Sequence, residues 1–225
     1  MSIWDWSYVW EAWPYLYRGA IVTVQATVLS FAIAVVLGLI IALIRQSPNR
    51  YVSTAMTEIV EFIRSTPLLL QVFFVYFVGP QFGILIPAWT AGIGMLGIHY
   101  AAYCSEVYRA GILAVEEGQW EACTALNLSR IRTWRTIILP QAIPPIVPAL
   151  GNYFVGMFKE TPILAAIAIL EMLQQAKIFG ANNYRYTEAI VMVGFFFLVF
   201  SLAASAIVQS VSIWLNRRYR LQRST

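Results

Sequence analysis

Long stretches without charged residues constrain this chain more than any other feature of its sequence. They run from Gly19 to Ile44, from Ser65 to Ser105 and from Ala189 to Asn216. A membrane helix needs about 20 predominantly apolar residues, so each stretch is long enough for one such helix or more. With 60% hydrophobic and 12% charged residues, the 225-residue chain lacks the composition of a soluble domain. We therefore expect an all-α integral membrane protein.

Turn residues divide these stretches into expected membrane spans. The segment from Gly79 to Trp89 contains Pro80, Gly83 and Pro87, which predicts a turn at one membrane face. Pro67 falls inside the second span and predicts a kink or a break there. The five expected spans, within a single transmembrane domain of residues 1–225, cover residues 19–44, 58–79, 91–112, 146–170 and 189–214.

Small and aromatic residues indicate how the spans pack and where they end. Ala34, Gly38 and Ala42 recur every four residues, which favours close approach of another helix. The glycines from Gly92 to Gly97 make the start of the third span equally thin. The aromatic cluster from Trp4 to Tyr17 suits the interface between membrane and water, where amphipathic rings lie at the level of the headgroups.

Lys and Arg flank the spans unequally, and this bias predicts the orientation. One side of the membrane would hold Arg45, Arg50, Arg64, Arg109, Arg130, Arg132, Arg135, Arg217, Arg218, Arg220 and Arg223. The other would hold only Arg18, Lys177 and Arg185. Because the cytoplasmic side carries the excess of positive charge, we expect the N-terminus outside and the C-terminus in the cytoplasm.

The loop of residues 116–141, between the third and fourth spans, has the pattern of an exposed docking element on the cytoplasmic side. Its polar residues fall at helical spacing, at Gln119, Glu121, Thr124 and Asn127, and another face carries Ala122, Ala125 and Leu126. This pattern predicts a short helix between two membrane spans. A transporter needs such an element if a partner outside the membrane must act on it.

A tight turn and a second helix are expected to follow. Asn127 suits the left-handed turn that ends a helix, and Leu128 follows it as the apolar contact. Ser129 is placed to cap a second helix from Arg130 to Ile138, which Pro140 is expected to terminate.

The sequence contains no motif that indicates catalytic chemistry. There is no Gly-x-x-x-x-Gly-Lys-Ser/Thr loop for nucleotide phosphates, and His99, the single histidine, has no clustered cysteines or carboxylates. We therefore expect no catalytic residue, metal or cofactor, so any ATP hydrolysis belongs to another chain. The arginines flank apolar runs, so the formal charge of +4 favours a membrane surface over nucleic acid.

The charges inside the fourth span predict a solute pathway. Lys159 and Glu160 are adjacent, so on a helix they point in different directions and do not pair directly. Pro162 disfavours helical geometry at Thr161, and a break there would expose backbone groups to a polar cavity. We expect the passage beside these four residues, with His99 and the thin start of the third span nearby. A structural role, in which the charges pair with other spans or with a partner, remains the alternative.

Several segments carry a resemblance to a known family. The residues Glu121-Ala122, the turn at Asn127 and the run from Leu139 to Ala142 resemble the EAA loop of bacterial ABC importer permeases, which usually has Gly where this chain has Asn127. Both residues tolerate positive φ. The chain is also similar to permeases for polar amino acids, of the histidine, glutamine and arginine type, at Phe62 to Leu68, Ala102 to Ile112, Gly118 to Ala122, and Lys159 to Pro162.

The resemblance implies a fold, partners and a location. It implies the type I ABC importer permease fold in a bacterial inner membrane, with a cytoplasmic coupling helix between the third and fourth spans. It also implies two copies of a cytoplasmic ATP-binding subunit, a second permease, identical or paralogous, and an extracytoplasmic solute-binding protein. The residues that would contact the ATPase are Gly118, Glu121, Ala122, Ala125, Asn127 and Leu128.

The implied activity is import of a polar amino acid or a similar small zwitterionic solute. Three alternatives stay open at this point. An importer of the same kind could carry compatible solutes of that size. An ion-coupled secondary transporter would work without ATPases but gives no reason for a cytoplasmic helix-turn-helix. A structural membrane subunit would leave the stretch from Lys159 to Pro162 unexplained.

Overall fold

The computed structural model describes residues 4–220, and every regular element in that range is helical, which confirms the expected all-α fold. Met1 to Ile3 and Arg223 of the expected basic tail lie outside the described residues. The elements are α1 (Trp6–Arg45), α2 (Arg50–Ser65), α3 (Leu68–Phe73), the π-helix η1 (Phe74–Val78), the 3-10 helix η2 (Gly79–Phe82), α4 (Ala88–Leu113), α5 (Glu117–Ala125), α6 (Arg130–Arg132), the π-helix η3 (Thr133–Ile138), α7 (Leu139–Glu160), the 3-10 helix η4 (Thr161–Ile167), α8 (Met172–Asn183) and α9 (Thr187–Arg220).

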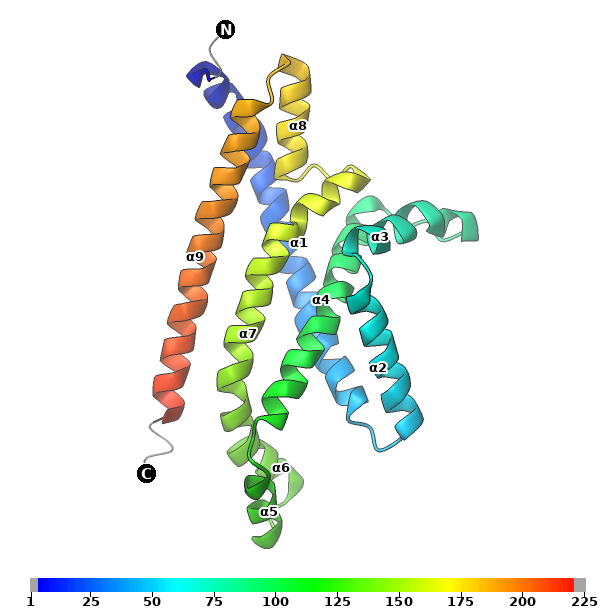
Figure 1. Cartoon of the computed structure of the whole chain (residues 1–225), viewed down its shortest axis with the longest axis vertical. Coiled ribbons are helices and arrows are strands. Elements are labelled where there is room, and N and C mark those ends of the chain that lie inside the picture. Colours follow the sequence, from blue (N-terminus) through cyan, green and yellow to red (C-terminus); the bar gives the residue numbers. More distant parts are fainter. Residues whose placement is uncertain (1–3, 221–225) are drawn as a thin grey trace.

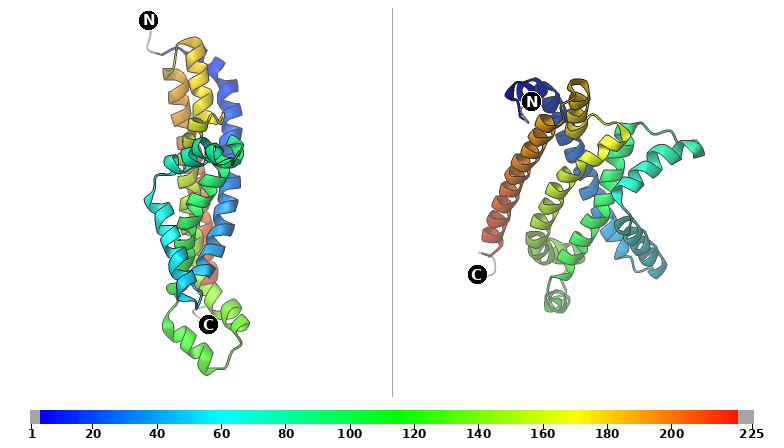
Figure 2. Two further views of the ribbon diagram at one scale, coloured as in Figure 1. Left: turned by 90° about the vertical axis from the view of Figure 1, so that its right-hand side faces the viewer. Right: turned by 45° about the horizontal axis from the view of Figure 1, so that its top comes forward.

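The long helices run alongside one another, and shorter helices lie at the two ends of this bundle (Figure 1). α1 packs most extensively against α4, and α7 packs against both α4 and α9. α5 and α6 form a hairpin at one end, whereas the start of α1 and α8 lie at the other (Figure 1). α3 and the turns after it project to one side of the bundle (Figures 1 and 2).

Within residues 4–220, two helices, Trp6–Arg45 and Thr187–Leu215, are long and apolar enough to cross a membrane by themselves. The number rises to four if each of two bent pairs counts as one span. In the first pair, Arg50–Ser65 and Leu68–Phe82 meet at 103°, so the expected second span is not one straight helix. The break predicted at Pro67 is confirmed, because Thr66 before it is extended, with φ −106° and ψ 139°.

The predicted end of the second loop helix at Pro140 is wrong. The chain stays helical from Arg130 through Glu160 and on to the end of η4. The reason lies in η3, because its wider π-helical turns come directly before Pro140, where an α-helical turn would bring the ring against the carbonyl of residue 136. Pro144, Pro145 and Pro148 also lie inside α7. The expected fourth span therefore begins earlier than residue 146.

Small residues bring α1 and α4 together as the sequence predicts. Ala34, Gly38 and Ala42 are all buried. A Cβ atom added to Gly38 would lie 2.7 Å from the Cβ of Cys104, so no larger residue fits there without movement. Gly94 differs, because an added Cβ would have nothing within 4 Å.

The aromatic N-terminal segment is part of α1, which begins well before the expected span at residue 19. Asp5 caps this helix, because its carboxylate accepts a hydrogen bond of 2.9 Å from the backbone N–H of Ser7. Bonds from that N–H and from the Ser7 hydroxyl hold the pKa of Asp5 below its ordinary value. Ala12 and Leu16 are buried in a cluster with residues of α8 and α9, so the segment is anchored to the protein as well as suited to an interface.

Candidate coupling hairpin and solute site

The turn between α5 and α6 has the geometry of a Schellman motif, a helix end closed by a left-handed residue. Asn127 has φ 47°, which confirms the predicted left-handed turn. The N–H of Asn127 donates to the carbonyl of Thr124, and the N–H of Leu128 donates to that of Cys123, both at 3.0 Å. Ser129 precedes α6, but its side chain makes no capping hydrogen bond.

Most of the predicted coupling residues are exposed, and four of them, Glu121, Ala125, Asn127 and Leu128, line a hollow between the helices of this hairpin. Exposed among them are Gly118, Glu121, Ala122, Ala125 and Asn127. Leu128 is half-buried. The face expected to be apolar is exposed as well, with Leu126 at 73%, and Cys123 is the buried residue of α5. The surface offered by α5 is therefore mixed, with polar and apolar side chains open to solvent.

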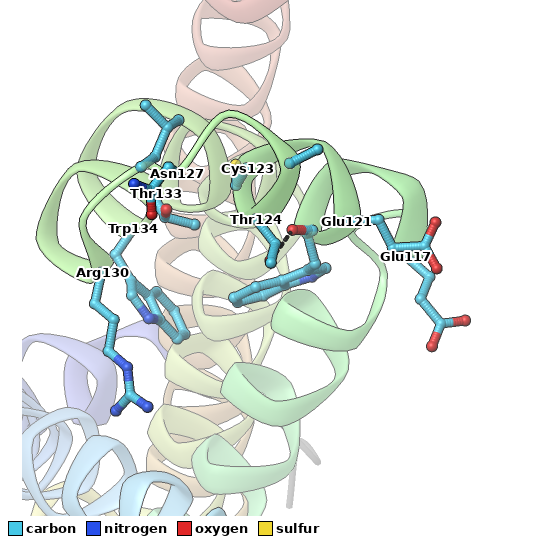
Figure 3. A pocket seen from close by; sticks show the side chains of 11 residues that line it. Glu117, Glu121, Cys123, Thr124, Asn127, Arg130, Thr133 and Trp134 are labelled. Atoms are coloured by element: carbon cyan, nitrogen blue, oxygen red, sulfur yellow. Dashed lines mark hydrogen bonds between the residues drawn. The ribbon is translucent and has the colours of Figure 1, made fainter.

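A hollow of about 900 Å³ lies between α5 and the start of α6. Figure 3 shows Glu117 and Glu121 toward one end of it and Arg130 toward the other. The Thr124 hydroxyl donates to the carbonyl of Trp120 within the same hollow. The hairpin thus presents a concave surface with an acidic end and a basic end.

The hairpin is fastened to the membrane helices at its base. Trp120 of α5 meets Trp134 of η3 edge to face, with ring centroids 5.4 Å apart. The amide of Gln141 donates to that of Gln119 at 3.3 Å. A buried cluster below them contains Val115, Ile138, Ala142 and Ile146. A force on α5 would therefore be transmitted to the end of α4 and the start of α7.

A carboxylate joins the ends of three helices near this base. Glu106 of α4 binds Arg45 at 2.6 Å and Arg109 at 2.7 Å, and it lies 3.7 Å from Arg64. The pairing of Glu106 with Arg109 agrees with their spacing on one helix. Arg64 also binds Glu61 at 3.0 Å, so it is shared by two carboxylates.

Gln71 holds the bend between α2 and α3. Its amide nitrogen donates to the carbonyl of Ile63 at 2.8 Å, to that of Thr66 at 3.2 Å and to the Thr66 hydroxyl at 2.6 Å. Its amide oxygen lies 3.0 Å from Nδ1 of His99 on α4. Because that oxygen is an acceptor, Nδ1 of His99 carries the proton. The bend is therefore tied to α4.

Aromatic rings connect His99 to the fourth expected span. His99 packs against Tyr103 at 5.3 Å between centroids, and Tyr103 packs against Tyr153 of α7 at 5.6 Å. The Tyr100 ring centroid lies 6.1 Å from the ring centroids of both Tyr103 and Tyr153. The Arg64 guanidinium lies 5.3 Å from the Tyr103 ring centroid. The sequence analysis missed these tyrosines and Arg64, although Tyr100 and Tyr103 share one face of a helix at i, i+3 spacing.

Glu160 is the predicted pathway residue that joins this cluster. Its side chain interacts with the Tyr100 hydroxyl, whereas its Oε2 is buried without a hydrogen-bond partner among the described residues. Lys159 is exposed, and no ion pair joins it to Glu160 within residues 4–220. Tyr100, whose ring contacts His99, connects it to Glu160.

The predicted break at Thr161 and Pro162 is displaced along the chain. The helix only tightens there, from α7 to η4, and the buried Thr161 hydroxyl donates to the carbonyl of Phe158 at 2.8 Å. The break comes at Ala168, which has φ 59°, and α8 leaves at 49°. Pro162 stands near the start of η4, where the helix changes from α to 3-10 geometry. Thr161 and Pro162 therefore do not break the helix.

Gly92, in the thin start of the third span, packs against η4 and the residues that follow it. A Cβ atom added to Gly92 would lie 2.9 Å from Cδ2 of Leu164 and 2.8 Å from Cδ1 of Ile169. Arg64 has a feature in common with Glu160, because its Nε is buried with no hydrogen-bond partner among the described residues. The cluster thus brings one positive and one negative group together across aromatic rings, each with an unused polar atom. No group of three or more His, Cys, Asp or Glu that could hold a metal ion occurs in the described part of the chain.

Comparison with known proteins identifies relatives over nearly the whole chain. Residues 34–220 match the family model described as binding-protein-dependent transport system inner membrane component. A probable amino-acid ABC transporter permease protein of Sinorhizobium fredii, y4tG, is 46% identical over 91% of this chain and 89% of its own length. The glutamine transport system permease protein GlnP of Escherichia coli is 33% identical over 96% and 98%. A solved structure described as an amino acid ABC transporter with histidines superposes with a TM-score of 0.89, at 37% identity, over 94% of this chain and 99% of that one.

Proposed function

We propose, from the premise that the chain belongs to the family of binding-protein-dependent transport system inner membrane components, that it passes a polar amino acid or a similar small zwitterion into the cytoplasm. ATP hydrolysis by a separate subunit would drive this passage. Relatives named as amino-acid and glutamine permeases support the class of solute. The observation that carries the proposal is the exposed α5–α6 hairpin, which is fastened to α4 and α7 by the pair Trp120–Trp134.

We propose that five segments cross the membrane within one domain of residues 1–225. They are α1, the bent pair of α2 and α3, α4, α7 with η4, and α9. α4 is too polar to count as a span by composition, yet its 26 residues extend about 39 Å, which exceeds the hydrocarbon thickness. Its neighbours α1 and α7 shield many of its side chains, including Tyr100. The arginines at the hairpin end support a cytoplasmic C-terminus and an outer N-terminus.

The hairpin is proposed to dock on the cytoplasmic ATP-binding subunit. Gly118, Glu121, Ala122, Ala125, Asn127 and Leu128 would supply the contacts. An exposed carboxylate beside small side chains permits close approach and a charge-assisted hydrogen bond. Since two such hairpins would serve two ATPases, the assembly would contain a second permease, identical or paralogous. A solute-binding protein would deliver the solute at the opposite face.

The solute is proposed to pass between Arg64 and Glu160. A zwitterion crossing a bilayer needs a partner for each of its charges, because unpaired charge at membrane depth is costly. Arg64 offers an unused donor and Glu160 an unused acceptor, with Tyr103 and Tyr100 between them. Thr161 and Pro162 would act by holding the end of α7, and His99 by holding the Gln71 bend. Lys159 would face lipid headgroups or a partner.

Reconstitution tests the proposal and separates it from the alternatives. We expect uptake of a labelled amino acid into proteoliposomes only when ATP, the ATPase subunit and the binding protein are all present. Uptake driven by an ion gradient without the ATPase would identify a secondary transporter and contradict the proposal. A ligand screen on the binding protein encoded beside this chain distinguishes amino acids from compatible solutes of the same size.

A further inference from the structure

We propose that Tyr184 is a docking point on this permease for the extracytoplasmic solute-binding protein. This inference rests on the proposed function. Tyr184 follows Asn183, the last residue of α8, and is 93% exposed. It has φ 52° and ψ 29°, a left-handed conformation that a bulky residue adopts at a cost glycine would avoid. Among the described residues no packing of so exposed a ring explains its presence, so the left-handed backbone points to a role in binding.

The turn that presents Tyr184 is held from several sides. The N–H of Arg185 donates to the carbonyl of Gly180 at 3.1 Å. The side-chain amide of Asn183 donates to the backbone carbonyl of Phe179 at 3.0 Å. A Cβ atom added to Gly180 would lie 2.8 Å from Cε1 of Tyr186, so that ring is packed tightly against the helix. The left-handed residue is therefore fixed in a defined direction.

Contacts with the N-terminal segment also hold this turn in place. Arg185 donates to the Glu188 carboxylate, whose side chain is 1% exposed. The same carboxylate accepts a hydrogen bond of 3.1 Å from the N–H of Asp5, and the Arg185 guanidinium lies 4.6 Å from the centroid of the Tyr8 ring. The backbone that carries Tyr184 is therefore held in place, so less backbone freedom is lost when a partner binds, which favours affinity.

The position of the turn fits a soluble partner outside the membrane. It lies beside the start of α1, at the opposite end of the molecule from the α5–α6 hairpin (Figure 1). Glu11 and Arg18 of α1 are exposed and charged, so the hydrocarbon layer begins below them. Tyr8, which packs on Arg185, precedes Arg18 by about 15 Å of helix. The headgroup layer is only about 5–8 Å deep on each side, so the turn lies at its outer edge or beyond it.

The partner is identified by chemistry and by the family. Tyrosine is enriched in the cores of protein interfaces, because its ring supplies apolar contact and its hydroxyl a hydrogen bond at little entropic cost. Transport in this family depends on a binding protein, as the description of the family states. Lipid headgroups are the competing occupant, since Trp6 and Trp10 are also exposed at this end of α1.

The test measures stimulation of ATP hydrolysis in the complete complex, in nanodiscs, as the solute-loaded binding protein encoded beside this chain is titrated. Tyr184→Ala and Tyr184→Gly are expected to raise the half-stimulating concentration about tenfold or more, the loss typical of an aromatic anchor. Tyr184→Gly relieves the backbone, so its melting temperature should not fall. Tyr51→Ala is the matched control, because Tyr51 is 87% exposed at the opposite membrane face, and it should leave that concentration unchanged.

Photocrosslinking provides the second measurement. A benzoylphenylalanine at position 184 is expected to form an adduct with the binding protein, and the same residue at position 51 is not. The proposal is wrong if both Tyr184 variants are stimulated at wild-type concentrations, or if the crosslinker at 184 captures only lipid. Those results leave the proposed function standing. A wild-type complex that the binding protein does not stimulate at all would overturn the proposed function and this inference together.

Discussion

The guanidinium of Arg45, at the last residue of α1, lies 2.6 Å from the carboxylate of Glu106 on α4. Their side chains are only 7% and 19% exposed, so the pair is shielded from water near the end of α1, where the connection to α2 begins. The Arg45 guanidinium also donates to the Thr57 hydroxyl of α2 at 3.2 Å. One cation therefore holds three helices together near the proposed cytoplasmic face.

This arrangement predicts unequal effects for two arginines that bind the same carboxylate. Arg45→Gln should lower the melting temperature of the purified complex, because Glu106 would lose its most shielded partner, at a cost of about 3 kcal/mol. Arg109→Gln should cost about 0–1 kcal/mol, because the Arg109 side chain is 42% exposed and its pair is screened by solvent. Thermal unfolding in detergent measures both. Equal losses in the two variants would show that shielding does not govern this network.

The close contact between α1 and α4 gives a second prediction. Gly38→Ala should destabilise the protein by about 1–3 kcal/mol, because the new methyl group would meet Cys104 and the carbonyl of Ala101, 3.0 Å from its position. Gly94→Ala is the control on the same helix pair, since nothing lies within 4 Å of its added Cβ. It should leave the melting temperature unchanged or raise it. A Gly94 variant as unstable as the Gly38 variant would mean that helical glycine matters here for another reason.

The left-handed turn of the hairpin gives a third prediction. Asn127→Gly should be neutral or slightly favourable, because glycine adopts φ 47° without steric cost. Asn127→Val should destabilise the turn by about 1–2 kcal/mol, because its branched Cβ meets the following carbonyl oxygen in that conformation. Copurification of the ATPase subunit reports assembly, and the valine variant should lose it while the glycine variant keeps it. Equal assembly in both variants would show that the turn does not shape the docking surface.

The exposed face of α5 gives a fourth prediction. Glu121→Lys should leave the permease folded and inserted, because Glu121 is exposed and makes no ion pair within residues 4–220. It should nevertheless uncouple ATP hydrolysis from transport, since truncating one partner of an interfacial charge pair typically costs about 2–5 kcal/mol. Parallel assays of uptake and ATPase rate measure this effect. Glu117→Lys, also in α5, is the matched control for added charge. Normal coupling in Glu121→Lys would remove this residue from the interface.

Local sequence signals predicted several of these features correctly. The break before Pro67, the left-handed Asn127 and the close approach at Gly38 each depend on one residue and its immediate neighbours. A fixed proline φ, a tolerance for positive φ and a missing side chain act wherever such residues occur. The continued helix at Pro140 could not be predicted in this way. The π-helix before it makes room for the ring, and no local propensity indicates a π-helix.

The proposed solute site was predicted only in part for a related reason. Glu160 was singled out in the sequence because a charge inside an apolar run is conspicuous. Arg64 and Tyr153 were missed, since they lie on α2 and α7 and meet Tyr103 only in the folded bundle. Sequence spacing carries no information about contacts between helices that are distant in the chain. The bend at Thr66 decides where Arg64 points, and the amide of Gln71 fixes that bend through tertiary contacts with His99.

The site itself gives the last prediction. Glu160→Gln should abolish or strongly reduce uptake while leaving assembly intact, because the amide keeps the shape of the side chain but removes the charge that a solute ammonium group would bind. Thr161→Val, its neighbour, removes the hydroxyl that donates to Phe158 and should affect stability more than solute preference. Uptake and stimulated ATPase rate are measured separately, with assembly checked by gel filtration. Loss of uptake in Glu160→Gln with an assembled, ATP-hydrolysing complex supports the site. Normal uptake, or failure only through dissociation of the complex, would make Glu160 a structural residue and place the pathway elsewhere.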